Sequence, residues 1–188
     1  MREGSMLANM ALSERDLIAV QAVYPDKRVE LRDGKIIIMS PSGDFSEAVA
    51  FELAARLREW VRPRKLGFIL TSSAGLRLPN GDIVAPDVSF VSKERMRIPP
   101  PGFAEVVPEL VVEVKSPSDR IAELEEKLAL LRSFEAQVVV LVDPEQRTVT
   151  VDAVGQPRRI LTNADTIDLP ALLPGWSTRI SELWPEPL

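Results

Sequence analysis

The chain has 188 residues, 45% of them hydrophobic and 27% charged, which is a composition typical of folded globular proteins. It contains neither cysteine nor histidine, and this excludes disulfides, zinc–thiolate sites, thiol nucleophiles, Ser-His-Asp triads and histidine-ligated metals. Any catalysis must therefore use carboxylates, lysines, hydroxyl groups or a hard metal ion held by oxygen atoms.

The formal net charge of −5 argues mildly against tight nonspecific binding of nucleic acid, although an acidic metal site would itself contribute to that charge. No apolar run reaches the length of a membrane-spanning helix. The stretch from Met1 to Ser5 lacks the apolar centre of a signal peptide, so we expect a cytoplasmic protein without a membrane partner. We expect residues 1–12 to form a flexible tail and residues 13–188 to form one domain.

The N-terminal part of the domain should be a helix followed by a hairpin. Ser13 and Asp16 have the spacing of a capping box, which would start a helix that runs to about Val23. The dipeptide Asp33-Gly34 is a strong signal for a two-residue hairpin turn between strands over 28–31 and 35–39.

A second helix and three strands should follow. Asp44 and Glu47 form a second potential capping box, and the helix would end near Pro63. Its apolar residues recur at helical spacing and should be buried: Val49, Leu53, Leu57 and Trp60. The strands are expected over 68–71, 76–78 and 83–91.

The second half of the chain is predicted to contain the central strand of the fold. Residues 110–115 begin as an apolar, β-branched run, which favours a strand buried on both faces. A helix over 119–133 and a strand over 137–142 follow, and the right-handed crossover rule makes these two strands a parallel pair. A further strand is expected over 147–152, and the apolar residues of 172–184 should cap the core.

Charged residues at the end of the central strand are the main candidates for chemistry. Glu113 and Lys115 are two residues apart, so on a strand they would project from the same face. Asp87 stands next to another short apolar strand. Buried strands rarely carry charges that neither pair nor do chemistry, so both interpretations stay open here: a functional site, or a Glu113–Lys115 ion pair with Asp87 capping a turn.

The order Pro86-Asp87 … Glu113-Val114-Lys115 resembles the PD-(D/E)XK restriction-endonuclease-like superfamily, and within it the bacterial Uma-type endonuclease family. Members of that family are mostly assigned as endonucleases by their fold. The resemblance extends over most of the chain and rests on the pieces Val29-Glu30-Leu31-Arg32-Asp33-Gly34, Met39-Ser40-Pro41, Ala85-Pro86-Asp87-Val88, Val112 to Asp119, Lys127, Val142-Asp143-Pro144 and Leu173-Pro174-Gly175-Trp176.

The resemblance implies an α/β fold with a restriction-endonuclease-like core in the order α-β-β-β-α-β. We expect a mixed central sheet, an N-terminal helix and hairpin, and extra C-terminal strands. It also implies a metal ion, Mg²⁺ with Mn²⁺ as a substitute, held by Asp87, Glu113 and the backbone carbonyl of Val114. Lys115 would stabilise the charge that develops on the phosphate, or orient the attacking water.

Two further residues are weaker candidates from the same resemblance. Some relatives rely on a lysine in the helix that corresponds to Lys127, but Glu123 lies four residues before it and a surface ion pair explains it equally well. Glu30 resembles a glutamate of the family and would be a third metal ligand; the alternative is an exposed strand residue. Many relatives carry a histidine about where Ser46 stands in this chain.

We assign no nucleic-acid-binding residues from the sequence. The basic cluster Arg56, Arg58, Arg62, Arg64 and Lys65 is interpreted as the solvated face of a helix, because that is the commoner reason for a charge run. The predicted function is Mg²⁺-dependent hydrolysis of DNA with low sequence specificity. The alternatives are a catalytically idle binding or regulatory module, and a structural protein that forms homo-oligomers through 172–184.

Overall fold

The structure is a computed structural model that describes residues 11–40 and 42–186. The predicted tail over 1–12 therefore lies almost wholly outside the described residues. Leu12, which is described, donates its backbone NH to the carbonyl of Gly34 at 2.8 Å. No helix in the described ranges is long and apolar enough to cross a membrane.

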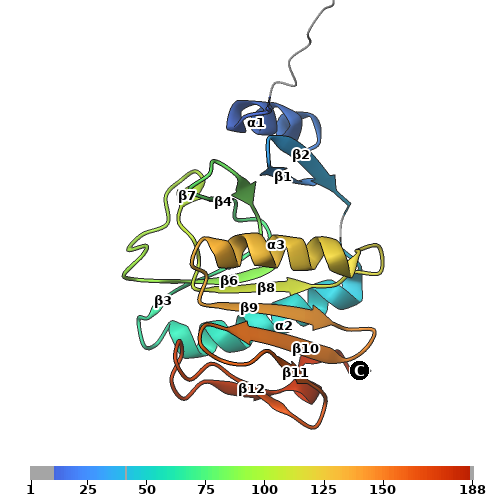
Figure 1. The fold of residues 1–188 in the computed structure, drawn as a ribbon, viewed down its shortest axis with the longest axis vertical. Coiled ribbons are helices and arrows are strands. Elements are labelled where there is room, and N and C mark those ends of the chain that lie inside the picture. The colour runs from blue at the N-terminus through green and yellow to red at the C-terminus, as the bar shows by residue number, and fades with distance from the viewer. Residues whose placement is uncertain (1–10, 41, 187–188) are drawn as a thin grey trace, which may run out of the picture.

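The N-terminal helix and hairpin form as predicted. The capping box of Ser13 and Asp16 starts the first helix, with Ser13 donating its NH and its hydroxyl to the Asp16 carboxylate. Asp33 and Gly34 both have positive φ, as a type I′ turn requires. In Figure 1 this part lies above the main sheet; its elements are α1 (Glu14–Val23), β1 (Arg28–Arg32) and β2 (Lys35–Met39).

The main sheet has six strands in the order β11-β10-β9-β8-β6-β3. Strands β8 and β9 are parallel, as the crossover rule predicted, and every other pair is antiparallel. With its helices the sheet gives the order α2, β3, β6, β8, α3, β9, which is the predicted α-β-β-β-α-β core. The bounds are α2 (Asp44–Val61), β3 (Gly67–Thr71), β6 (Val88–Ser92), β8 (Leu110–Val114), α3 (Ile121–Ser133), β9 (Val138–Asp143), β10 (Thr148–Ala153) and β11 (Arg159–Leu161).

The single strand predicted over 83–91 is wrong. The segment Ala85-Pro86-Asp87 interrupts it, because Pro86 has no NH to continue a ladder. The two halves join different sheets: β6 lies in the main sheet, whereas β5 pairs with β1. The smaller sheet has the order β2-β1-β5-β4-β7, with β4 (Leu76–Arg77), β5 (Ile83–Val84) and β7 (Ala104–Glu105).

The two long helices cover opposite faces of the main sheet, because successive side chains of β8 pack alternately on the side of α2 and on the side of α3. Leu110, Val112 and Val114 pack in the core cluster with α2. Val111 packs in the cluster with α3, and Glu113 shares that face. Figure 1 shows α3 lying across β8 and β9.

Some details of these helices differ from the prediction. The second capping box does not form; Gly43 is the N-cap of α2 and no side chain bonds the cap. Trp60, which was predicted to be buried, is only partly buried. The other predicted core positions of α2 are buried.

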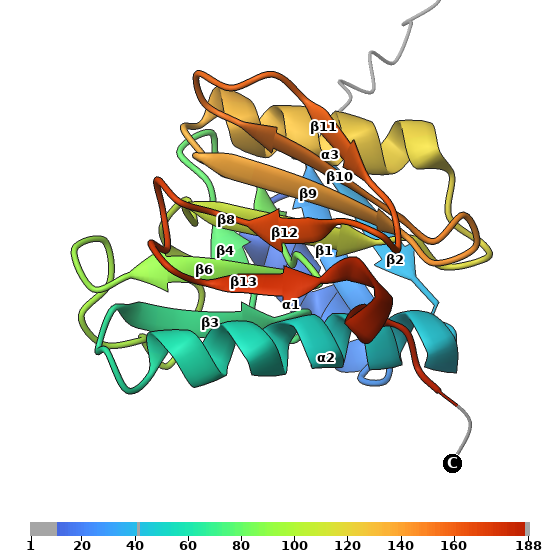
Figure 2. The same cartoon turned by 90° about the horizontal axis from the view of Figure 1, so that it is seen from below.

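The C-terminal segment caps the core as predicted. It contains β12 (Thr166–Asp168), β13 (Ser177–Arg179) and a 3₁₀ helix over Ile180–Leu183. Figure 2 shows β12 and β13 lying over the main sheet on the side of α2. The buried residues Leu173, Trp176, Leu183 and Trp184 belong to the core cluster of α2. These side chains are therefore used within the chain itself.

Candidate active site

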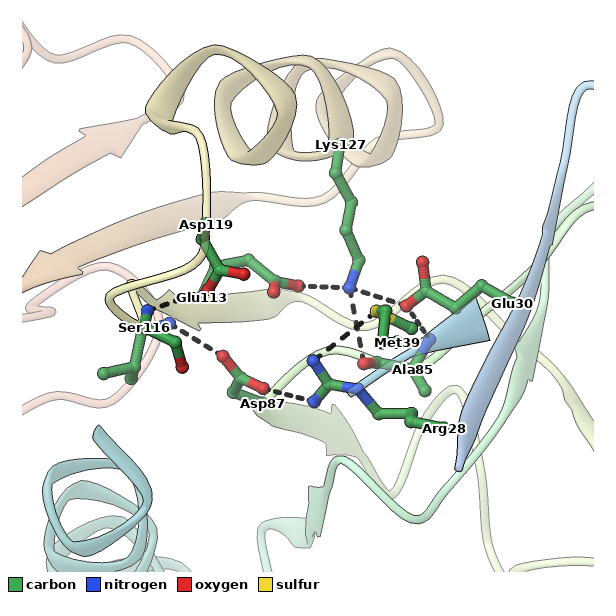
Figure 3. A network of polar contacts seen from close by, with 10 residues as sticks. Arg28, Glu30, Met39, Ala85, Asp87, Glu113, Ser116, Asp119 and Lys127 are labelled. Atoms are coloured by element: carbon green, nitrogen blue, oxygen red, sulfur yellow. Dashed lines mark hydrogen bonds and ion pairs between the residues drawn. The ribbon is translucent and has the colours of Figure 1, made fainter. Parts of the chain in front are cut away.

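The pairing of β6 with β8 brings Asp87 and Glu113 together. Val88 lies opposite Val112 in the antiparallel register, so the preceding residue, Asp87, reaches the level of Glu113. The Asp87 Oδ2 atom accepts a hydrogen bond from the NH of Val114 at 2.8 Å. Both carboxylates are buried on the face of the sheet that α3 covers (Figure 3).

Lys127 reaches this pair from α3. It lies on the buried face of the helix with Leu128 and Leu131. Its Nζ is 2.7 Å from Glu113 Oε1 and 2.7 Å from Glu30 Oε1, and it donates to the carbonyl of Ala85 at 3.3 Å. The alternative of a surface pair with Glu123 is wrong.

Glu30 is fully buried on β1 and belongs to the same network. Its Oε1 also accepts the NH of Ala85 at 2.8 Å, and its Oε2 lies 3.3 Å from Nε of Arg32. The alternative of an exposed strand residue is therefore wrong. Figure 3 shows Glu30 and Glu113 on opposite sides of the Lys127 amine.

Arg28 also belongs to this network, although it was not predicted from the sequence. Its guanidinium donates to Asp87 Oδ1 at 2.5 Å and approaches the sulfur of Met39 at 3.6 Å. The signal that could have found it is its spacing: Arg28 lies two residues before Glu30 on the same strand and so shares its face.

The amine of Lys115 is not part of the network. It lies 2.7 Å from Oε2 of Glu145, in the turn between β9 and β10. Lys115 follows the last residue of β8, so strand alternation no longer fixes its direction. Its carbonyl accepts a hydrogen bond from the hydroxyl of Ser46 at 2.9 Å, which ties the start of α2 to the end of β8.

Burial and charge together set the ionisation of the network. Burial raises the pKa of Glu113 to about 8; the nearby Lys127 offsets part of this rise, whereas Asp87 and Glu30 add to it. Burial also disfavours the charged form of Glu30, but attraction to Lys127 and Arg32 and the hydrogen bonds from Lys127 and Ala85 together outweigh it and lower the pKa of Glu30. Burial would lower the pKa of Lys127, and attraction to Glu113 and Glu30 raises it instead. At neutral pH Glu113 therefore carries a proton, while Glu30 and Lys127 are charged.

The oxygen atoms of this site fit a hard divalent cation. Glu113 Oε1 is buried and lies 2.7 Å from the Lys127 amine, so a metal ion would share this carboxylate with Lys127. Asp87 would supply a second carboxylate and Val114 a carbonyl. Within residues 11–40 and 42–186 no group of three or more acidic side chains could hold a metal. Glu30 is directed to Lys127, so the donor set has two carboxylates.

Comparison with solved structures defines the class of fold. The structure matches the "Crystal structure of a putative nuclease belonging to DUF820 from Anabaena variabilis ATCC 29413" with a TM-score of 0.72 and 20% identity, over 82% of this chain and 88% of that chain. The fold is therefore the restriction-endonuclease-like fold. A second match, the "cryoEM structure DrdV-DNA complex", has a TM-score of 0.33 and 12% identity, over 61% of this chain and 12% of that chain.

The family follows from the sequence itself. Residues 15–181 match the profile of the Uma2 family, described as "Putative restriction endonuclease". The chain belongs to this family. No curated protein matches the chain.

The raised pKa of Glu113 predicts a pH dependence of stability. The unfolded side chain has a pKa near 4.5 and the folded one about 8, so its contribution is fully present below pH 4.5 and is lost as the pH rises to 8. Between these values the free energy of unfolding should fall by up to about 1.4 kcal/mol per pH unit. Glu113→Gln should lack this fall and be the more stable protein at pH 8 in EDTA. Urea titrations from pH 5 to pH 8 measure this; Glu145→Gln is the exposed control, and parallel curves for all three proteins would contradict the raised pKa.

The buried position of Lys127 predicts that replacing this side chain should greatly lower the stability of the fold. Lys127→Gln leaves the charge of Glu30 buried without its main partner, which should destabilise the protein by about 3–5 kcal/mol. Lys115→Gln breaks a pair with the exposed Glu145 and should cost less than about 1 kcal/mol. Chemical denaturation at pH 7 compares the two. Equal stabilities would show that Lys127 is not held in a buried ion network.

Proposed function

We propose that this protein is a metal-dependent endonuclease that hydrolyses DNA phosphodiester bonds. The observation that carries the proposal is the convergence of Asp87 and Glu113 from adjacent strands, with the NH of Val114 bonded to Asp87. The Uma2 family membership supports a nuclease activity. We also propose, as the sequence predicted, that this hydrolysis has low specificity for the DNA sequence.

Asp87, Glu113 and the carbonyl of Val114 would hold the ion, which we propose to be Mg²⁺, with Mn²⁺ as a substitute. When bound, such an ion stabilises negative charge on the phosphodiester and lowers the pKa of an attacking water. The protein's own contribution begins with Glu113, which must lose its proton to act as an anionic ligand. Because its pKa is about 8, Glu113 holds this proton at neutral pH and releases it increasingly as the pH rises towards 8.

The two lysines would have different roles. Lys127 is held beside Glu113 by the charge of Glu30, so a positive charge is fixed at the site before any substrate binds. Lys115 can reach a substrate only by leaving Glu145, and an exposed pair of this kind is worth about 1 kcal/mol or less. We propose that Lys115 stabilises charge on the phosphate and that Lys127 acts with it. Glu30 serves as a positioning residue for Lys127.

One observation favours a second candidate, a catalytically idle module of the same fold. Neither of the two central carboxylates carries an uncompensated charge: Arg28 pairs with Asp87, and Glu113 is neutral at pH 7 beside Lys127. A network that is balanced in this way is complete without a metal ion. The two candidates differ in whether a metal ion displaces Arg28 and the proton of Glu113.

Nicking of supercoiled plasmid with Mn²⁺ at low salt tests the activity. Asp87→Asn and Glu113→Gln should each lower the rate about a hundredfold or more, because each removes an anionic ligand, and Lys115→Ala should lose a similar amount. Glu145→Gln, which only frees Lys115, is the matched control and should stay active. Absence of nicking by the wild-type protein with any divalent metal, or equal nicking by all variants from a contaminant, would refute the endonuclease proposal.

The contact of Arg28 with Asp87 predicts how replacement of Arg28 should change the affinity of the protein for a metal ion. Its guanidinium occupies Asp87 Oδ1, so Arg28→Gln should bind Mn²⁺ several-fold more tightly than the wild type does, whereas Asp87→Asn should bind it far more weakly. Arg32→Gln is the matched control, since Arg32 approaches Glu30 and not Asp87. Isothermal titration calorimetry gives all four affinities. Unchanged or weaker binding by Arg28→Gln would show that Arg28 and the metal do not compete for Asp87.

A further inference from the structure

A groove of about 550 Å³ lies at the C-terminal end of α2, at the other end of this helix from Ser46. Five cations line it and no acidic residue does. Its walls also contain small and apolar residues of α2 and β3. The cations are Arg58, Arg62, Lys65, Lys93 and Arg97.

The fold builds this groove from two segments of the chain. The register of β3 with β6 places Gly67 opposite Ser92, and the NH of Lys93 donates to the carbonyl of Leu66 at 2.9 Å. Gly67 allows this close approach, because a Cβ atom there would lie 2.1 Å from the carbonyl oxygen of Val91. The cations after β6 are thereby fixed beside those at the end of α2. The cluster is therefore more than one solvated face of a helix.

The charges of the groove are largely uncompensated within the described part of the chain. Arg58, Arg62, Lys65 and Arg97 form no ion pair there, and Lys93 only approaches Glu94 at 3.9 Å. Arginines elsewhere are commonly paired, as Arg56, Arg77 and Arg132 are. Unpaired guanidinium groups that converge on an open groove are suited to phosphate oxygens. Several such cations from two segments of the chain are better suited to a chain of phosphates than to a single phosphate group.

We propose that this groove binds the sugar–phosphate backbone of DNA and anchors it away from the candidate active site. The identity of the polyanion as DNA rests on the proposed function. Because α2 has 18 residues, its two ends are about 27 Å apart. Phosphates of one strand advance about 3.4 Å per base pair, so DNA would need roughly eight base pairs to extend over this distance.

The test compares two triple variants with the same net charge. Arg62→Ala/Lys65→Ala/Arg97→Ala removes groove cations, and Arg15→Ala/Arg147→Ala/Arg179→Ala removes exposed cations elsewhere. Fluorescence anisotropy measures binding of a duplex of about 20 base pairs in EDTA, between 50 and 200 mM salt. The groove variant should lose about tenfold or more in affinity, and the slope of log K against log salt should decrease by about 2–3. The control should lose less than about twofold, as expected if nonspecific net charge contributes little.

Further measurements distinguish DNA binding in the groove from the proposed nuclease activity and from binding of other phosphate-containing ligands. If the wild type binds DNA through the groove but never nicks, the inference stands and the endonuclease proposal fails. If the two triple variants bind DNA equally, the inference is wrong whatever the nicking result. Loss of binding to phosphatidylserine vesicles, or to inorganic phosphate, by the groove variant without loss of DNA binding would also overturn it.

Discussion

The charge of Lys127, buried between Glu30 and Glu113, is the interaction on which the site depends. It joins three elements that are distant in sequence: β1, β8 and α3. Burial of charged groups is costly, and apolar residues of similar size could pack at least as well. We therefore propose that this network serves chemistry rather than stability. The same contacts dock the hairpin of β1 and β2 against the nuclease core, so site and fold are coupled.

The charges of the network are paired in a way that leaves one group free to change its protonation state near neutral pH. Asp87 is matched by Arg28 and Glu30 by Lys127, whereas Glu113 is neutral at pH 7 because its pKa is about 8. Glu113 is thus the member whose charge changes most readily near neutral pH. A site of this kind is compact without a metal ion and can still present two carboxylates to one.

Local patterns in the sequence predicted the fold well, and long-range contacts account for what was missed. The turn signal Asp33-Gly34 and the crossover between β8 and β9 depend on neighbouring residues and were found. The side-chain partners of Lys127 and Lys115 were not found. A helical ion pair between Lys127 and Glu123 fits the sequence equally well until it is known which face of α3 is buried. Lys115 lies beyond the end of β8, where the alternation of side chains between the two faces of a strand no longer applies. Arg28 and the loop cation Arg97 reach their sites through pairing between distant strands.

The most direct test of the proposed metal site is a crystal of the wild-type protein soaked in Mn²⁺, with anomalous diffraction data collected at the manganese edge. We expect one anomalous peak between the carboxylates of Asp87 and Glu113, at about 2.0–2.3 Å from an oxygen of each. The guanidinium of Arg28 should then have moved away from Asp87. An anomalous map without a peak at these carboxylates, with Arg28 still bonded to Asp87, would contradict the assignment of this network as a metal site.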